Sequence, residues 1–566
     1  MVPSVRMQYK TEFDLSQTLN GDGASKEKIT AALDTIAKEI AAFRPDSFRF
    51  DTLQHIMALL EETGSIILCM TSVDVKDSRA KKWEAAADEL SSKLSSLSLE
   101  IDNLLALLSQ RDFQSLVQKH PAIAFHLQEK RNWIREKLPT DREKLIETLS
   151  SPGHRDWTSL YYTLIGEIEF EWEGNTCNIS TLETKLRDRN PDIRTKAFTL
   201  LQQGLKRHEN LFGVALNAIA RYRMKVYELR KWDTLHESLH ANRISKKTLT
   251  AMQTSIDANA PSLHDYIDKK KRALGLQTVR YFDLDAPIDP QSPVFSWDEA
   301  VHMILDAFGA FGPKLKAFAE EALKKGWVDV AKRPHKRAGG FCTSLPLSKM
   351  NLILLTFGEN FSSIATLAHE LGHAYHSHVL YKKPLLAQHY PMCIAESAST
   401  FCEILLTDHL LKRYPKLMLD EIYSRHATFL MDLHARYLFD FDLHTKAAEH
   451  FLSSSELSSL MQDAQNRAYG KTIEPFDHFW CYKMHFYFTD TPFYNWPYTF
   501  GYLMSRGLFH HLKDDPARED KWILFFQDSG SMQLEELAKK HLNLDITQTD
   551  FWNTSCRLPL PFNLHC

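Results

Sequence analysis

Helical periodicity is the feature that most constrains what this chain can fold into. Apolar residues recur at steps of four and three in two stretches of its first third: Ile29, Leu33, Ile36, Ile40 and Phe43, and Leu90, Leu94, Leu97, Ile101, Leu104 and Leu108. The pattern predicts long antiparallel helical hairpins, with the first helix ending near Arg44 because a proline follows. The second stretch could be a coiled coil that binds a partner, but its short length favours packing within the chain.

Composition excludes several classes of protein. The chain has 566 residues, enough for more than one compact unit, with 68 Lys and Arg against 72 Asp and Glu. The net charge of −4 lacks the basic excess typical of nucleic-acid binding. Only 20 glycines and 22 prolines are present, which disfavours turn-rich β folds and disorder.

Cysteine usage and hydropathy indicate a compartment. The eight cysteines are scattered without a CxxC pair, as is typical of reduced thiols. The first ten residues lack the apolar core of a secretory signal, and no run of about 18 apolar residues predicts a membrane span. We therefore expect a soluble, cytoplasmic protein that binds neither membranes nor nucleic acid.

Two regions and one small sheet are expected along the chain. Asn190-Pro191-Asp192 is a plausible boundary between an N-terminal helical region, residues 1–190, and a second region, residues 191–566. β-prone segments occur at residues 278–283 and 351–357, and they predict a small sheet within residues 278–357. The expected fold class is mainly α with one minor β element.

The segment His369-Glu370-Leu371-Gly372-His373 follows the second β-prone segment and is predicted to be helical. Residues four apart on a helix lie one above the other, so both imidazoles can bind one metal ion. Glu370 would then lie beside the metal, where it can take a proton from a water held by the ion. Ser362 and Ser363 are candidate N-caps of this helix.

A hydrolytic zinc site needs a third protein ligand and one open position. Val379 stands where the HExxHxxGxxH pattern needs a histidine, so the third ligand must come from a later helix. Glu396 is the best candidate, because Ala395 and residues 397–399 are small and permit close helix packing. Glu403 is either a carboxylate that orients a ligating histidine or a solvated surface group. His376 is expected to be a packed, hydrogen-bonded histidine.

An aromatic-rich segment, residues 480–507, offers hydrogen-bond donors in His485, Tyr494, Tyr498 and Tyr502. A zinc peptidase must stabilise the oxyanion that forms when a peptide carbonyl is attacked. Spacing alone leaves these side chains equally compatible with a role as donors and with a place in the core.

The motifs together resemble the oligoendopeptidase F-type members of the M3 family of zinc metallopeptidases, relatives of thimet oligopeptidase. The resemblance covers about residues 190–566 and rests on LAHELGHAYHS at 367–377, AESASTFCE at 395–403 and HFYFTDTPFYNWPYTFGYLMS at 485–505, with a weaker match in KRAGGFC at 336–342. It implies a two-lobed helical body around a deep channel, with zinc on the floor and a small sheet in one wall. Residues 1–190 would form part of that wall.

The resemblance also implies roles for single residues. His369, His373 and Glu396 would bind one Zn²⁺ per chain, and Glu370 would be the general base. His485, Tyr498 and Tyr494 would be oxyanion or substrate donors. The substrate contacts would be Gly339, Gly340, Phe341 and Tyr502, with the glycines forming an edge that pairs with an extended peptide.

The function predicted is a zinc-dependent endopeptidase that cuts internal bonds of short peptides. Two alternatives remain. A helical zinc carboxypeptidase or dipeptidyl-peptidase would share the ligand layout, and a catalytically silent peptide-binding protein would keep the site without its chemistry. Glu370 argues against the silent protein, because a binder has no need of that carboxylate.

Overall fold

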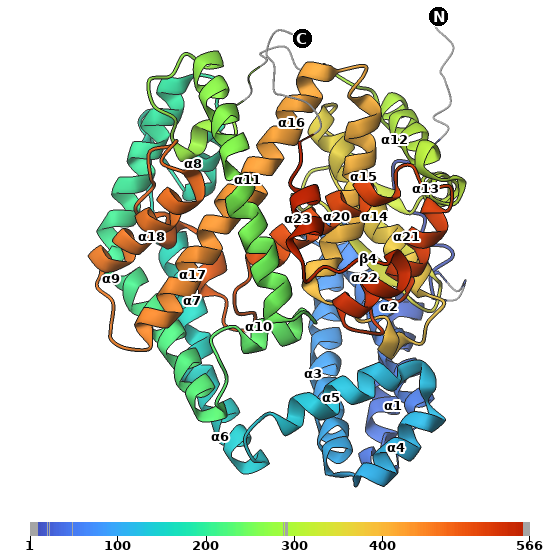
Figure 1. Cartoon of the computed structure of the whole chain (residues 1–566). Helices are drawn as coiled ribbons and strands as arrows, with labels where there is room; N and C mark the ends of the chain where they lie inside the picture. The colour runs from blue at the N-terminus through green and yellow to red at the C-terminus, as the bar shows by residue number, and fades with distance from the viewer. Residues whose placement is uncertain are drawn as a thin grey trace, which may run out of the picture. The chain divides into compact units, whose positions relative to one another are not determined.

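The computed structural model describes residues 9–19, 21, 23–47, 49–286, 288 and 293–558. Helices dominate the described chain and strands are few and short (Figure 1), so the mainly-α prediction is confirmed. The chain divides into two compact units: unit 1 comprises Met1–Glu136, Pro293–Leu410 and Leu508–Leu544, and unit 2 comprises Lys137–Ser292, Leu411–Gly507 and Asp545–Cys566. Each unit draws on residues from both sides of position 190. The predicted division at that position and the predicted channel stay predictions.

Unit 1 contains eleven complete helices and a three-stranded sheet among its described residues. Its helices are α1 (Lys26–Ala42), α2 (Phe50–Val73), α3 (Ser78–Leu107), α4 (Gln110–Lys119), α5 (Ala124–Arg135), α12 (Trp297–Phe311), α13 (Pro313–Lys325), α14 (Phe361–Leu380), α15 (Met392–Leu410), α21 (Arg518–Gln527) and α22 (Leu534–Leu542). Its strands are β3 (Val328–Asp329), β4 (Phe341–Leu345) and β5 (Met350–Leu354). Short helical turns lie at Pro45–Ser47, Pro121–Ile123 and Leu385–Ala387.

The described residues of unit 2 are helical apart from one short hairpin. Its helices are α6 (Thr140–Ser150), α7 (Asp156–Glu167), α8 (Ile179–Leu186), α9 (Pro191–Arg230), α10 (His236–Ala241), α11 (Lys246–Ala273), α16 (Pro415–Ala427), α17 (Leu433–Ala447), α18 (Ser454–Tyr469), α19 (Phe479–Tyr482) and α23 (Thr549–Ser555). The hairpin pairs β1 (Phe170–Trp172) with β2 (Asn175–Cys177). Shorter turns lie at Ser151–Arg155, Tyr281–Asp283, Thr428–Asp432 and Met484–Tyr487, and α20 (Trp496–Leu512) ends in unit 1.

The predicted helical seam of residues 90–108 is a packing stripe within unit 1. Leu90, Leu94 and Ile101 are buried, and α3 packs against α1, α2 and α5. Toward the end of α3 the burial moves from Leu104, which is 39% exposed, to Leu105, which is 3% exposed. A straight helix has 3.6 residues per turn and so drifts away from a strict seven-residue repeat, which accounts for this change.

The three-stranded sheet of unit 1 lies between two helices. Its order is β3-β5-β4, with β3 parallel and β4 antiparallel to β5. On β4, Thr343 Oγ1 lies 2.7 Å from Ser65 Oγ of α2, whereas the hydroxyl of Ser344 donates to Ser377 Oγ of α14 at 3.0 Å. Successive side chains of a strand point to opposite faces, so α2 covers one face of β4 and α14 the other. The outer edge of β4 pairs with no other described strand.

The predicted strand at residues 278–283 is wrong. Arg280 makes one isolated bridge to Glu474, and the chain then enters a 3-10 turn at Tyr281–Asp283. The carboxylate of Asp283 accepts from the backbone N–H of Arg280 and from the guanidinium of Arg194, which is buried with it. These bonds satisfy the turn locally, which removes the need for a strand partner.

One helix in the described part of the chain, α2, is long and apolar enough to cross a membrane by length and composition alone. Within its most apolar stretch, 56% of the residues are buried inside the protein. A core helix of a folded domain passes the same test.

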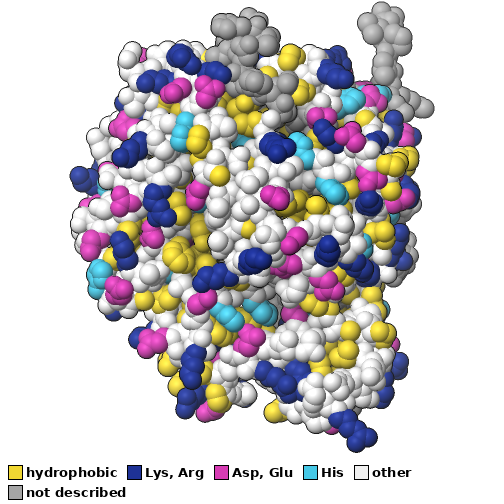
Figure 2. All heavy atoms as spheres, in the orientation of Figure 1, with side chains coloured by type: hydrophobic (Ala, Val, Ile, Leu, Met, Phe, Trp, Pro, Cys, Tyr) yellow, Lys and Arg dark blue, Asp and Glu magenta, His cyan; other side chains and the backbone are white. Residues whose placement is uncertain are grey.

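Surface charges of both signs are mixed on the face shown in Figure 2, where Lys and Arg side chains lie among Asp and Glu side chains. This distribution follows from the near-balanced composition of the chain. Neither sign dominates that face.

Candidate metal centre

The helix that carries the candidate metal ligands, α14, begins directly after the buried strand β5. Its N-cap is Asn360, whose side-chain oxygen accepts from the backbone N–H of Ser363 at 2.9 Å. The N-cap is therefore Asn360. The sequence indicated Ser362 or Ser363 instead, and neither of these residues caps the helix. An Asn cap satisfies one of the free N–H groups in the first turn and fixes where the helix starts.

His369, His373 and Glu396 come together in unit 1 from two neighbouring helices. The two Nε2 atoms of the histidines are 3.1 Å apart, and Glu396 Oε2 lies 3.3 Å from the first and 3.6 Å from the second. A tetrahedral zinc ion with ligands at about 2.0–2.1 Å separates its ligand atoms by about 3.3 Å. The donor set and its spacing therefore fit one such cation, and the three residues form a possible metal-binding group.

The electrostatics of this trio also suit a cation. Burial alone would lower the pKa of His369, but hydrogen bonds with Glu396 and Glu403 raise it to about 10. Burial and the charge of His369 lower the pKa of His373 to about 4. Burial opposes ionisation of Glu396, yet the hydrogen bond from His369 and the charges of both histidines bring its pKa to about 2. The carboxylates thus hold positive charge between the imidazoles, and a metal ion can replace it.

Glu403 lies behind the trio on α15. Its carboxylate is 2.7 Å from Nδ1 of His369, and the residue is only 6% exposed. The solvated-surface alternative is therefore excluded. A carboxylate bonded to Nδ1–H leaves Nε2 of His369 facing Glu396 with its lone pair available to a metal.

Replacing Glu403 by glutamine is expected to weaken metal binding about 10–100-fold, because the amide no longer fixes the ring with a charged acceptor. Titration with a competing chelator measures this change. An unaltered affinity would mean that Glu403 has no influence on the ligand.

The close packing of α14 on α15 brings the ligands together. A Cβ atom built at Gly372 would lie 2.6 Å from Cα of Ser399 and 2.8 Å from the carbonyl oxygen of Ala398. Only a residue without a side chain fits there. The small residues noted in the sequence are therefore at the helix contact.

Gly372→Ala is expected to lower the free energy of unfolding by about 1–3 kcal/mol, because backbone atoms must move to admit the methyl group. Thermal denaturation measures the loss. Gly64→Ala is the matched control: it lies inside α2, its added methyl meets no atom within 4 Å, and it should leave stability equal or higher. Equal melting temperatures for the two variants would contradict the packing argument.

Glu370 lies beside the trio and faces the start of β4. The residue is 6% exposed, and burial raises its pKa to about 7. A Cβ atom built at Gly340 would lie 3.4 Å from Glu370 Oε1. Gly339 has a φ of +92°, in the left-handed region that favours glycine, and Phe341 begins the edge strand. The glycine segment thus runs directly past the carboxylate.

His485, Tyr494 and Tyr498 form a cluster in unit 2. The ring of Tyr494 lies 5.0 Å from that of His485 and 5.5 Å from that of Tyr498, and the Tyr498 hydroxyl donates to that of Tyr494 at 2.9 Å. All three are half-buried, so each keeps exposed atoms. Their roles as donors stay predictions.

Tyr502 and His376 lie in the core. Tyr502 is 2% exposed, its hydroxyl is bonded to His426, and its ring stacks on Phe429 at 4.3 Å. These contacts leave it no surface for the substrate, which corrects the predicted contact. His376 is fully buried, with Nε2 2.9 Å from Ser529 Oγ, and is packed as expected.

Sequence reasoning missed two side chains that hold His485. A guanidinium nitrogen of Arg436 lies 3.4 Å from Nδ1 of His485, and the side-chain oxygen of Asn495 lies 2.8 Å from the same atom. An amide oxygen only accepts, so the shorter contact is that of an Nδ1–H donor, whereas the guanidinium of Arg436 only donates and would need Nδ1 as an acceptor. The side-chain nitrogen of Asn495 is buried and has no partner in the described chain. The only local signal was the i,i+4 spacing of Arg436 from Asp432, its ion-pair partner.

A His-Glu-x-x-His helix completed by a glutamate from a following helix is the site of a metallopeptidase. The family model for peptidase family M3 matches residues 185–557, about two thirds of the chain. The chain belongs to this family.

Relatives at low identity agree with this assignment. The oligoendopeptidase F homolog of Lactococcus lactis subsp. lactis is 25% identical over 390 residues, which cover 66% of this chain and 63% of the relative. Oligopeptidase PepF of Bacillus subtilis is 25% identical over 388 residues and 57% of its length. The chain thus spans less than two thirds of these relatives, whereas its match to an oligoendopeptidase F homolog of Borreliella burgdorferi covers 89% of both chains at 24% identity.

Solved structures share the fold. A protein from Chlamydophila abortus superimposes with a TM-score of 0.83 at 20% identity and covers 98% of this chain and 96% of its own. Oligoendopeptidase-F from Enterococcus faecium has a TM-score of 0.66 at 17% identity, with 94% and 95% coverage.

Proposed function

We propose that this protein is a zinc-dependent endopeptidase that hydrolyses internal bonds of short peptides. The observation that carries the proposal is the trio of His369, His373 and Glu396, spaced for one tetrahedral cation, with the carboxylate of Glu370 beside it. Membership in peptidase family M3 supports the reaction class, and the oligoendopeptidase names of the relatives support the substrate class.

Glu370 is the residue that transfers protons during cleavage of the peptide bond. When bound, the metal acidifies a water molecule and polarises the peptide carbonyl. Glu370 accepts the proton that the attacking water loses and then delivers it to the leaving nitrogen. Its burial favours both steps, because a carboxyl with a pKa near 7 can take up and release a proton at neutral pH.

The free edge of β4 would hold the substrate backbone. An extended peptide can add to an exposed strand edge through main-chain hydrogen bonds, with no demand on its side chains. Gly339, Gly340 and Phe341 lie at the end of that edge nearest Glu370, and the glycines let a peptide backbone approach closely.

His485, Tyr494 and Tyr498 would donate hydrogen bonds to the carbonyl oxygen as it gains negative charge. This role comes from the family resemblance of residues 485–505. The half-buried state of these three side chains supports it, because each keeps atoms that a substrate can reach.

Further features of the proposal rest on composition and donor chemistry. Two imidazoles and one carboxylate favour zinc over harder cations, with one ion per chain. The described cysteines are all free, which supports a reducing, cytoplasmic location. We propose short peptides as the only partners, with neither nucleic acid nor membrane involved.

A digest of mixed short peptides tests the proposal. Wild-type protein loaded with zinc and its Glu370→Gln variant are incubated side by side, and the products are identified by mass spectrometry. Internal cuts made by the wild type alone support the endopeptidase. Removal of one or two residues from one end would show the exopeptidase alternative, and metal binding without cleavage would show the silent peptide-binding protein.

A further inference from the structure

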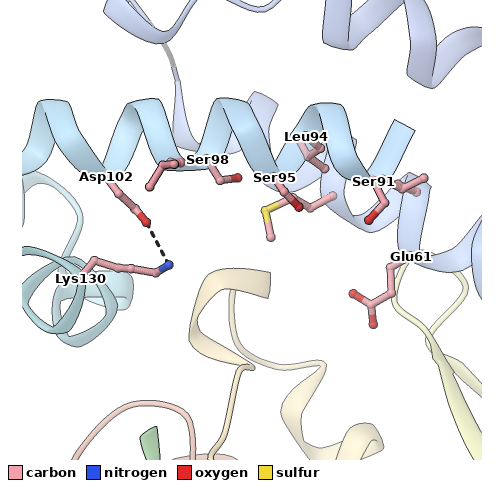
Figure 3. A pocket seen from close by; sticks show the side chains of 10 residues that line it. Glu61, Ser91, Leu94, Ser95, Ser98, Asp102 and Lys130 are labelled. Atoms are coloured by element: carbon pink, nitrogen blue, oxygen red, sulfur yellow. Dashed lines mark hydrogen bonds and ion pairs between the residues drawn. The ribbon is translucent and has the colours of Figure 1, made fainter. Parts of the chain in front are cut away.

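A groove in unit 1 lies between α2, α3 and α5. Its volume is about 500 Å³, and Figure 3 shows the side chains that line it. α3 contributes the hydroxyls of Ser91, Ser95 and Ser98 along one wall, and Glu61 projects from α2 into the open space (Figure 3). The groove is therefore a recess of mixed lining, with Glu61 at one end and apolar side chains beside the hydroxyls: Met57, Leu60, Leu94 and Leu99.

The charge of this recess belongs to Glu61. At the other end Lys130 and Asp102 neutralise each other in an ion pair of 3.0 Å, drawn as a dashed line in Figure 3. Among the described residues no hydrogen bond or ion pair engages the Glu61 carboxylate. Its chain neighbour Glu62 is instead buried and accepts backbone N–H groups from Leu19, Leu347 and Ser348. The two acids thus face different surroundings.

The groove shares α2 with the strand whose edge the proposed function assigns to the substrate. α2 runs antiparallel to β4: the N–H of Arg337 donates to the carbonyl oxygen of Ser72, and Thr343 contacts Ser65. Glu61 lies one helical turn beyond Ser65, on the same face of α2. It therefore lies toward the end of β4 that is remote from the catalytic carboxylate.

The distance along the strand sets which part of a peptide reaches this recess. Gly340 abuts Glu370, and β4 ends at Leu345, five residues further on. At about 3.3 Å per residue this is about 17 Å of extended peptide. Side chains on one face of such a peptide point toward α2, because successive residues alternate between the faces.

We propose that this groove is a subsite that binds a positively charged group of the peptide substrate through Glu61. The inference rests on the proposed function. The cation is either the ammonium group of the peptide N-terminus or a Lys or Arg side chain several residues from the cleaved bond. Glu61 is exposed in the groove, so a cation can reach it. The protein around its carboxylate and the charge of Glu62 raise its pKa to about 7, so the ion lacks stabilisation that a cation would supply.

The test compares matched peptides of equal length. The parent is acetylated and uncharged, one series places a single Lys at each position in turn, and another has a free N-terminus without Lys. For the zinc-loaded wild type we expect kcat/KM to be about tenfold higher for one charged peptide than for the parent. The responding series identifies the source of the cation.

Glu61→Gln is expected to reduce this ratio to about 1, and Glu61→Lys to favour a peptide with Glu at the same position. Glu100→Gln, an identical change at an exposed site of α3 outside the groove, should keep the wild-type ratio. Equal ratios for wild type and Glu61→Gln would overturn the subsite while leaving the endopeptidase intact. Cleavage of none of the peptides by the wild type would instead refute the proposed function.

Discussion

Glu370→Gln is expected to lower kcat/KM for peptide hydrolysis by about 10²–10⁴-fold, the range that a positioned general base contributes. Glutamine has nearly the shape of glutamate but cannot take up a proton. Raising the pH therefore cannot restore the variant. Peptide cleavage followed by mass spectrometry or a fluorogenic substrate measures the loss.

The same substitution should not disturb the metal or the fold. Glu370 is not among the three grouped ligand atoms, so zinc content measured by elemental analysis should stay at one ion per chain. Burial raises its pKa from 4.5 to about 7, which means that ionisation is harder in the folded protein than in the unfolded chain. This cost grows as the pH rises from about 4.5 to about 7, so the metal-free variant should melt no lower than wild type at neutral pH.

Glu359→Gln is the matched control, because that exposed glutamate lies just before α14 and outside the metal centre. It should retain wild-type turnover. A Glu370→Gln variant that holds zinc and still cleaves peptides at the wild-type rate would remove Glu370 from the mechanism.

The local parts of this site could be read from the sequence, because they depend on helix geometry alone. His369 and His373 are four residues apart, and one turn of helix places both rings on one side. Glu396 follows His373 by 23 residues, so its position next to the histidines depends on packing between two helices. The small residues Ala398 and Ser399 signalled that packing, and Gly372 faces them in the structure.

Other features could not be predicted because their causes lie far away in the sequence. The segment around Tyr281 reads as a strand, but Arg194, 89 residues from Asp283, stabilises a turn there. The spacing of Tyr502 is compatible with a donor and with a core residue, and only the structure shows that His426, 76 residues away, engages its hydroxyl in the core. Hydrophobic periodicity indicates which face of an element is buried, but it does not indicate which polar residue from a distant part of the chain will contact that element.

Removing a metal ligand should abolish metal binding and with it peptide cleavage, whereas Glu370→Gln should abolish cleavage and keep the metal. In His373→Ala the remaining pair, His369 and Glu396, offers two ligands where a catalytic zinc site has three. We expect zinc affinity to fall by at least about 10²-fold, which is more than the loss expected for Glu403→Gln. At zinc concentrations that fully activate the wild type, the variant should cleave no peptide.

Thermal stability gives a readout of the same site that does not depend on activity. A ligand that binds only the folded state stabilises it by about 4 kcal/mol at a free concentration 1,000 times its Kd. Zinc should therefore raise the melting temperature of wild type and Glu370→Gln, whereas a chelator reverses the rise. His373→Ala should show no such response at the same concentration. His378→Ala removes an exposed histidine from the same helix and should respond as wild type does. If His373→Ala kept the full zinc-induced rise, the cation would be bound elsewhere and the trio could not be the metal centre, whatever the spacing of its three ligand atoms.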